Sequence, residues 1–174
     1  MWVRRPGGVK ANTANAGTGP GPDPGSLGCR GMKIIDLEPG DARLDAEILP
    51  VLRELRPHLT PELFAEVYAE GYAQGLRFTA AYADDGTCAG VAGWRVIVNT
   101  SALRKLYVDD LVTAESARSG GVGHALLAHL ESRARVLGCH VLNLDSGTKR
   151  TAAHRFYLRE RMDITGFHFV KRLD

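Results

Sequence analysis

The residues of this chain most able to do chemistry gather in the segment from Leu106 to Leu130, which reads LYVDDLVTAESARSGGVGHALLAHL. An apolar strand pattern runs there into a polar link, a glycine-rich turn and an amphipathic helix pattern. Glycines let successive backbone N–H groups converge on one point, and a helix start adds unpaired N–H groups and the positive end of its dipole. This arrangement is typical of a binding site for phosphate or pyrophosphate.

Three kinds of site begin in this way, and the residues around the glycines separate them. A nucleotide P-loop needs Lys and then Ser or Thr after its last glycine, whereas His and Ala follow Gly123. A dinucleotide fingerprint needs a third glycine where Leu126 stands, and its first glycine directly at the strand end, where residues 114–120 intervene. The remaining pattern, R-x-x-G-x-G, fits residues 118–123, although a loose turn without a ligand is the alternative for this motif taken alone.

The hydrophobic pattern predicts the elements that must position this turn. Helical spacing of apolar residues and strand-like alternation follow one another in the order β, α, α, β, β, β, α, β, α, β. This order predicts an α/β fold with a mixed, mostly antiparallel central sheet flanked by helices, and one βαβ crossover centred on the glycine turn. The expected strands are residues 32–38, 76–83, 88–98, 103–113, 139–145 and 164–172, and the expected helices are residues 41–56, 61–75, 122–137 and 150–161.

Length and charge restrict the class of protein. The chain has 174 residues, 44% of them hydrophobic, which suits one globular domain with a sizeable core. Its 22 basic and 20 acidic residues give a formal charge of +2, and the first 31 residues supply +3, so the remainder carries about −1. We therefore expect no nucleic-acid partner. No run of 18 apolar residues occurs, so no membrane span is expected either.

The first 31 residues differ in composition from the rest, with eight Gly and four Pro and few large apolar side chains. Such a segment buries too little surface to offset its ordering entropy, so we expect a flexible tail over 1–31 and the domain over 32–174. Its lack of an apolar core argues against a signal peptide. Cys29, Cys88 and Cys139 form no CxxC pair, which indicates neither a disulfide framework nor a zinc site. We therefore expect a cytoplasmic protein.

Two segments, YVDDLVTAESARSGGVGHALLAHLESRARVLGC and LNLDSGTKRTAAHRFYLRE, resemble the GNAT superfamily of N-acetyltransferases, and the resemblance extends over residues 32–174. It implies acetyl-CoA as co-substrate, an amine as acceptor, direct attack without an acyl-enzyme, and no metal. The R-x-x-G-x-G turn looks like the family's pyrophosphate loop, in which Arg118, Ser119, Gly120, Gly121, Val122, Gly123 and His124 would contact the cofactor. For His124, a solvated position on the helix is the alternative.

The resemblance also implies roles around the reacting atoms. Backbone amides of Leu111, Val112 and Thr113 would bind the acetyl carbonyl, and Asn143 would meet the pantetheine or the acceptor. Tyr157 would protonate the leaving thiolate, with a core tyrosine as the alternative.

Asp109 would take the proton of the ammonium, directly or through water, with a charged strand-end residue as the alternative. Strand alternation predicts that Asp109 and Asp110 point in opposite directions. One departure stands out: Arg161-Met162 replace the Gly-Phe pair with which relatives usually end the helix of Tyr157.

Two questions stay open at this level. The acceptor could be a small molecule or a protein amine, and the number of subunits is undetermined, with a homodimer as one candidate. The alternative function from another class is a non-catalytic acyl-CoA-binding regulatory domain. Tyr157 and Asp109 favour an enzyme, since binding alone needs neither side chain.

Overall fold

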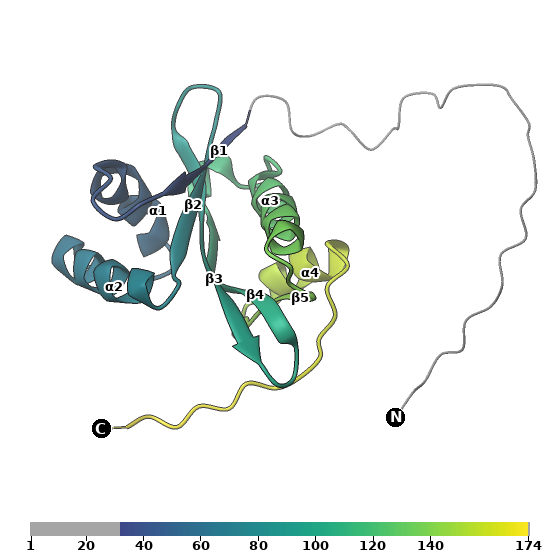
Figure 1. Ribbon diagram of the computed structural model, residues 1–174. Helices are drawn as coiled ribbons and strands as arrows, with labels where there is room; N and C mark the ends of the chain where they lie inside the picture. Colours follow the sequence, from purple (N-terminus) through teal and green to yellow (C-terminus); the bar gives the residue numbers. More distant parts are fainter. Residues whose placement is uncertain (1–31, 174) are drawn as a thin grey trace, which may run out of the picture.

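The structure is a computed structural model that describes residues 32–173, so the tail expected at residues 1–31 lies outside the described part (Figure 1). Its centre is a five-stranded sheet with the strand order β1-β2-β3-β4-β5. Strands β1 to β4 pair antiparallel with one another, whereas β5 runs parallel to β4. This confirms a mixed, mostly antiparallel sheet. The strands are Lys33–Leu37, Arg77–Tyr82, Cys88–Asn99, Leu103–Thr113 and Val141–Leu144.

Helices cover both faces of the sheet. In Figure 1, α1 and α2 lie on one side of the strands and α3 and α4 on the other. The π-helical turn η1 spans Leu44–Ile48, α1 Leu49–Arg53, α2 Pro61–Ala73, the 3₁₀ turn η2 Glu115–Ala117, α3 Val122–Val136 and α4 Thr151–Arg159.

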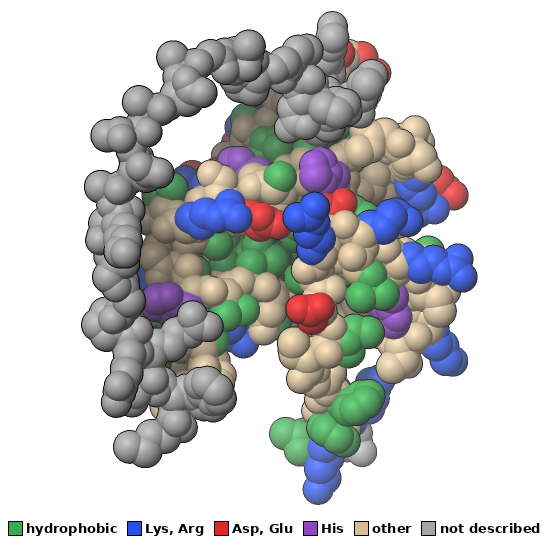
Figure 2. Space-filling model, turned by 90° about the vertical axis from the view of Figure 1, so that its right-hand side faces the viewer, with side chains coloured by type: hydrophobic (Ala, Val, Ile, Leu, Met, Phe, Trp, Pro, Cys, Tyr) green, Lys and Arg blue, Asp and Glu red, His purple; other side chains and the backbone are tan. Residues whose placement is uncertain are grey.

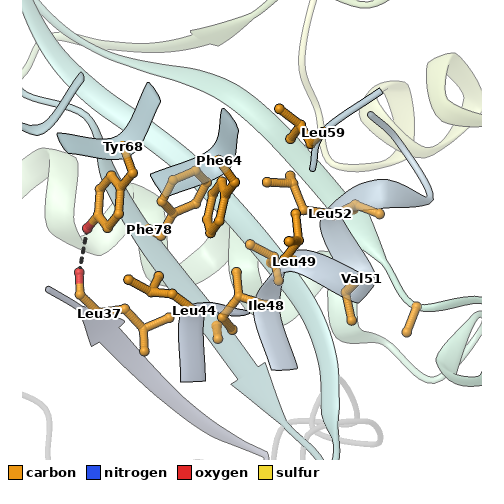
Figure 3. Close-up of a cluster of buried hydrophobic side chains, with 14 of the residues drawn as sticks. Leu37, Leu44, Ile48, Leu49, Val51, Leu52, Leu59, Phe64, Tyr68 and Phe78 are labelled. Carbon is orange, nitrogen blue, oxygen red and sulfur yellow. Dashed lines mark hydrogen bonds between the residues drawn. The ribbon is translucent and has the colours of Figure 1, made fainter. Parts of the chain in front are cut away.

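The layer beneath α1 and α2 is an apolar core with three central aromatic rings (Figure 3). Phe64 and Tyr68 project from α2 onto Phe78 of β2, and the rings of Tyr68 and Phe78 meet edge to face at 4.9 Å between centroids. The Tyr68 hydroxyl donates a 2.7 Å hydrogen bond to the carbonyl oxygen of Leu37. This bond connects α2 to the end of β1. It also gives the buried Tyr68 hydroxyl the hydrogen-bond partner that a buried polar group needs.

The opposite layer places α3, and with it the glycine turn at its start. Leu126, Leu127 and Leu130 on α3 are buried, as the apolar spacing of this helix predicted. Beneath α3, the indole N–H of Trp94 donates to the hydroxyl of buried Thr79 at 2.9 Å.

Three helix ends have backbone or side-chain features that local sequence can be related to. The Thr60 hydroxyl accepts a hydrogen bond from the N–H of Leu63 and thus caps α2. Gly138 follows the C-cap of α3 with φ +69°, as expected of a glycine at that position. Arg161 adopts φ +63° after α4, so an arginine occupies the left-handed position where relatives place glycine.

The helix expected over 41–56 is present in a shorter form, as η1 followed directly by α1, with Pro50 in the first turn of α1. One expectation about the elements was wrong. The strand expected over residues 164–172 is not formed, and residues 162–173 adopt neither helix nor strand. Figure 2 shows hydrophobic and basic side chains on a protrusion below the body of the molecule. The alternating pattern of that segment favours an extended chain, but a strand exists only where a neighbouring strand accepts its hydrogen bonds.

The bond between Tyr68 and Leu37 can be tested directly. Tyr68→Phe should lower the free energy of unfolding by about 1–3 kcal/mol, because a buried carbonyl loses its partner. Tyr72→Phe is the matched control, since the Tyr72 hydroxyl bonds to Glu38 at the surface and its loss should stay within about 0.5 kcal/mol. Urea denaturation measures both, and equal losses would contradict this role of Tyr68.

Candidate active site

The site is built on a short parallel ladder between β4 and β5. Only four residue pairs join these strands, from Lys105 with Val141 to Val108 with Leu144. Beyond Val108, β4 continues to Thr113 while paired only with β3. The second edge of β4 is therefore free from Asp109 onward, and the two parallel strands part at this point.

The register of β3 and β4 decides which amides face this opening. The N–H of Ala114 donates to the carbonyl oxygen of Ala89 at 2.9 Å, so hydrogen-bonded and non-hydrogen-bonded pairs alternate from there. Val112 lies in a hydrogen-bonded pair and turns its N–H toward β3. Leu111 and Thr113 turn theirs the other way, toward the opening. Three amides were expected at the acetyl carbonyl. Those of Leu111 and Thr113 point into the opening, whereas that of Val112 is hydrogen-bonded to β3 and cannot bind there.

The glycine turn has the backbone conformation that convergent amides require. Ser119 has φ +66° and Gly121, the N-cap of α3, has φ +79°. The first hydrogen bond closing α3 runs from the N–H of Ala125 to the carbonyl oxygen of Gly121. The amides of Val122, Gly123 and His124 precede it and have no intrahelical acceptor. The N–H of Gly120 donates instead to Ala117 at 3.2 Å, so the anion-binding amides belong to the later part of the loop.

Charged side chains around the turn are already paired. Arg118 donates to Glu54 at the end of α1 at 3.2 Å and to Glu115 at 3.4 Å. His124 Nδ1 lies 2.7 Å from a carboxylate oxygen of Glu160, which joins the start of α3 to the end of α4. An anion at this turn would therefore compete with Glu54 for Arg118.

Tyr157 lies on α4, which approaches the start of α3 closely. A Cβ added at Gly123 would lie 3.2 Å from the ring of Phe156 and 3.6 Å from the Thr113 hydroxyl. The glycine thus permits α4, α3 and the free part of β4 to meet. Tyr157 is half-buried, and this burial raises the pKa of its phenol, although the Arg150 cation opposes the rise. The phenol is therefore protonated at neutral pH and able to donate.

Two buried polar atoms at the end of β5 have no partner within residues 32–173. They are the side-chain oxygens of Asn143, opposite Tyr107 in the ladder, and of Ser146, just after the strand. Buried polar groups normally find hydrogen bonds, so a missing partner at this place indicates room for a polar ligand. The amide groups of a pantetheine chain would supply such partners, and the site therefore fits the cofactor expected from the sequence.

Asp109 and Asp110 face the same cavity, and the expectation that they point in opposite directions was wrong. The register of β3 and β4 shifts between Gly93 and Trp94, which makes Asp109 the extra residue of a β-bulge. A bulge interrupts strand alternation, so adjacent side chains can turn the same way. The cavity has a volume of about 530 Å³ and is lined by Leu52, Arg56, His58, Leu59, Leu63, Phe64, Val67, Leu76, Phe78, Arg95, Tyr107, Asp109 and Asp110.

Two arginines that sequence reasoning missed hold these acids. Arg95 donates to Asp109 and Arg56 donates to Asp110, each over 2.8 Å. Burial raises the pKa of Asp110, while the adjacent Arg56 acts in the opposite sense. Tyr107 also lines the cavity, and its hydroxyl donates to Asp145 at 2.7 Å. Burial and this hydrogen bond raise the pKa of Tyr107.

Comparison with known proteins identifies this architecture. The sequence profile described as Acetyltransferase (GNAT) family matches residues 44–162, which include the glycine turn, the opening between β4 and β5 and Tyr157. The chain belongs to the GNAT acetyltransferase family. Among the described residues of this GNAT protein, no helix has the length and apolarity needed to span a membrane. Residues 32–173 also contain no cluster of three or more His, Cys, Asp or Glu side chains placed to hold a metal ion.

Curated relatives of this GNAT chain match parts of it. An aminoalkylphosphonate N-acetyltransferase of Salmonella typhimurium is 39% identical over 66 residues, which make up 38% of this chain and 43% of that enzyme. The matched region is thus less than half of that relative. An uncharacterized N-acetyltransferase of Bacillus subtilis is 30% identical over 112 residues, 64% of this chain and 79% of that protein.

Solved structures share the fold. The aminoglycoside N-acetyltransferase AAC(6′)-Iy in complex with CoA has a TM-score of 0.69 at 18% identity, covering 82% of this chain and 94% of its own. Glucosamine-6-phosphate N-acetyltransferase from Arabidopsis thaliana has a TM-score of 0.64 at 19% identity, covering 82% of this chain and 99% of its own. At these identities the likeness concerns the GNAT fold.

Proposed function

We propose that this protein transfers the acetyl group of acetyl-CoA to a primary amine seated in the cavity of Asp109 and Asp110. The observation that carries the proposal is the place of that cavity. Its acidic wall, Asp109 and Asp110, lies on β4 directly after Val108, where this strand parts from β5. The free amide of Leu111 follows immediately. An amine in the cavity and a thioester in the opening would therefore meet along one strand.

On this proposal the protein binds acetyl-CoA at two places, its diphosphate and its pantetheine chain. The amides of Val122, Gly123 and His124 would bind the diphosphate, with Arg118 adding positive charge. The side-chain oxygen of Asn143 would accept a hydrogen bond from the pantetheine chain. Acetyl-CoA supplies the activated acyl group, and everything else in the reaction falls to side chains and amides of the protein.

The transfer makes one bond and breaks one. The neutral amine nitrogen attacks the acetyl carbonyl, the C–N bond forms, and the C–S bond breaks with its electron pair leaving on sulfur. The amides of Leu111 and Thr113 stabilise the negative charge that develops on the carbonyl oxygen. Tyr157 donates its proton to sulfur, so that CoA leaves as a thiol. The nitrogen gives up one of its two protons to the acidic wall and keeps the other. The products are an N-acetyl amine and CoA, and return of that proton to Tyr157 through solvent restores the enzyme.

Asp109 was expected as the base, and we assign that role to Asp110, with Asp109 beside it. Arg95 donates to Asp109 and fixes the position of its carboxylate in the cavity wall. The side chain of Asp110 is less exposed than that of Asp109, 14% against 24%. Burial raises the pKa of Asp110, which favours proton acceptance by this carboxylate.

The names of relatives support an amine acceptor, since aminoalkylphosphonates, aminoglycosides and glucosamine 6-phosphate all carry amines. A direct test separates an enzyme from a non-catalytic acyl-CoA-binding regulatory domain. The protein is incubated with acetyl-CoA and a panel of amines, and free thiol is followed with a chromogenic reagent. Amine-dependent thiol release supports the proposal, whereas CoA binding without release under every amine would favour the regulatory domain.

The cofactor loop is tested by a pair of valine substitutions. Gly121→Val forces a β-branched residue into φ +79° at the N-cap of α3, so acetyl-CoA affinity should fall about tenfold or more, roughly 1.4 kcal/mol. Gly138→Val imposes the same kind of strain, φ +69°, at the other end of that helix, with no atom within 4 Å of the added Cβ. Calorimetry should show that Gly138→Val binds acetyl-CoA with normal affinity. Normal affinity in both variants would mean that the cofactor binds at another place.

The proton donor is tested by Tyr157→Phe. The turnover number should fall by roughly 10²–10⁴-fold, because a positioned acid is lost, while the dissociation constant of acetyl-CoA changes little. A general acid works only while protonated, and the raised pKa of Tyr157 puts the decline of kcat above the pH expected for an ordinary tyrosine. That high-pH decline should vanish in the variant. The exposed-site change Tyr72→Phe should leave the profile intact, and full turnover in Tyr157→Phe would end the assignment.

A further inference from the structure

The charges of the acceptor cavity form two complete ion pairs. Arg95 pairs with Asp109 and Arg56 with Asp110, and Arg56 also donates to the backbone carbonyl oxygen of Asp109 at 3.3 Å. The charges of these two cations and two anions cancel. A simple ammonium would enter as an uncompensated charge, because each carboxylate already has its guanidinium. Burying an uncompensated charge is unfavourable.

The two members of the pair at Asp110 differ in exposure. The side chain of Asp110 is 14% exposed, and it packs across from Gly93, where a Cβ would lie 3.3 Å from its carboxylate. The side chain of Arg56 is 45% exposed and lies outside any helix or strand, just after α1. The carboxylate is thus the fixed inner partner and the guanidinium the outer one. An ammonium that reaches Asp110 displaces Arg56, which then needs an anion.

The cavity offers an apolar surface between these charges and α2. Leu63 and Val67 on α2 line it and remain exposed, and the buried Leu59 lines it beside them. Burial of a ligand's hydrocarbon portion against these side chains is favourable, because it removes apolar surface from water. The site therefore fits a molecule with a charged group at each end and a short apolar spacer.

We infer that the acceptor is a small zwitterionic amine, with its ammonium at Asp109 and Asp110 and an anionic group, such as a carboxylate or phosphonate, on the displaced guanidinium of Arg56. Such a molecule exchanges partners with the ion pair and leaves the cavity neutral. Arginine suits this role because its planar fork binds carboxylate and phosphonate oxygens in pairs. This inference rests on the proposed acetyl transfer.

The test uses amines that share a chain length and differ only at the far end. An aminoalkylphosphonate, the matching amino acid with a terminal carboxylate, and the matching amino alcohol are compared as acceptors and, with CoA present, as ligands by calorimetry. The acids should have kcat/KM at least tenfold above the alcohol. Arg56→Gln should collapse this ratio, and Arg53→Gln should keep it, since Arg53 lies at the end of α1 and does not line the cavity.

The outcomes separate this inference from the proposed function. Equal or faster acetylation of the alcohol would overturn the zwitterionic acceptor and leave acetyl transfer standing. Acids that bind in an Arg56-dependent manner without being acetylated would support the cavity's specificity and refute the transfer. A preference for acids that survives Arg56→Gln would overturn the role of Arg56 and with it the inference.

Discussion

The early end of the β4–β5 ladder is the constraint on which the rest of this structure depends. Four residue pairs hold the strands together, and after Val108 the edge of β4 has no neighbour. Unpaired amides would be a liability in a sheet interior, yet here they face a space that ends at the glycine turn on one side and at the acidic cavity on the other. A longer ladder would use up the amides of Leu111 and Thr113 and would leave the glycine turn and the acidic cavity without a common wall.

The β-bulge at Asp109 gives the other half of the arrangement. An unbroken strand would send one of the two acids into the opposite layer, among the apolar residues beneath α3. The bulge turns both into the cavity, and Gly93 leaves space for the carboxylate of Asp110, since a Cβ there would lie 3.3 Å from that carboxylate. One local departure from regular strand geometry and one glycine thus supply the cavity with its charge, and both lie in the pairing of β3 with β4.

What the sequence could predict follows the range of the interactions involved. The glycine turn and the helix that follows it depend on a few consecutive residues, and their positions were predicted correctly. The bulge was missed because it depends on the register between two strands, and Arg56 was missed because its partner lies 54 residues away. The last strand failed for a related reason. Residues 164–172 have the pattern of a strand, but a pattern cannot show that a neighbouring edge accepts it.

Charge pairing links the two halves of the site through the short segment that ends α1. Glu54 holds Arg118 of the cofactor loop and accepts the N–H of Glu115, while Arg56, two residues later, holds Asp110 in the cavity. Without ligands, each cation in this chain of contacts is neutralised by an acid of the protein itself. Ligand binding is then an exchange of partners, and its net free energy is the difference between two sets of ion pairs rather than the sum of new ones. The side chains that hold the glycine turn and the cavity wall thus come from one short segment, residues 54–56, and an exchange of partners at either place would involve that segment.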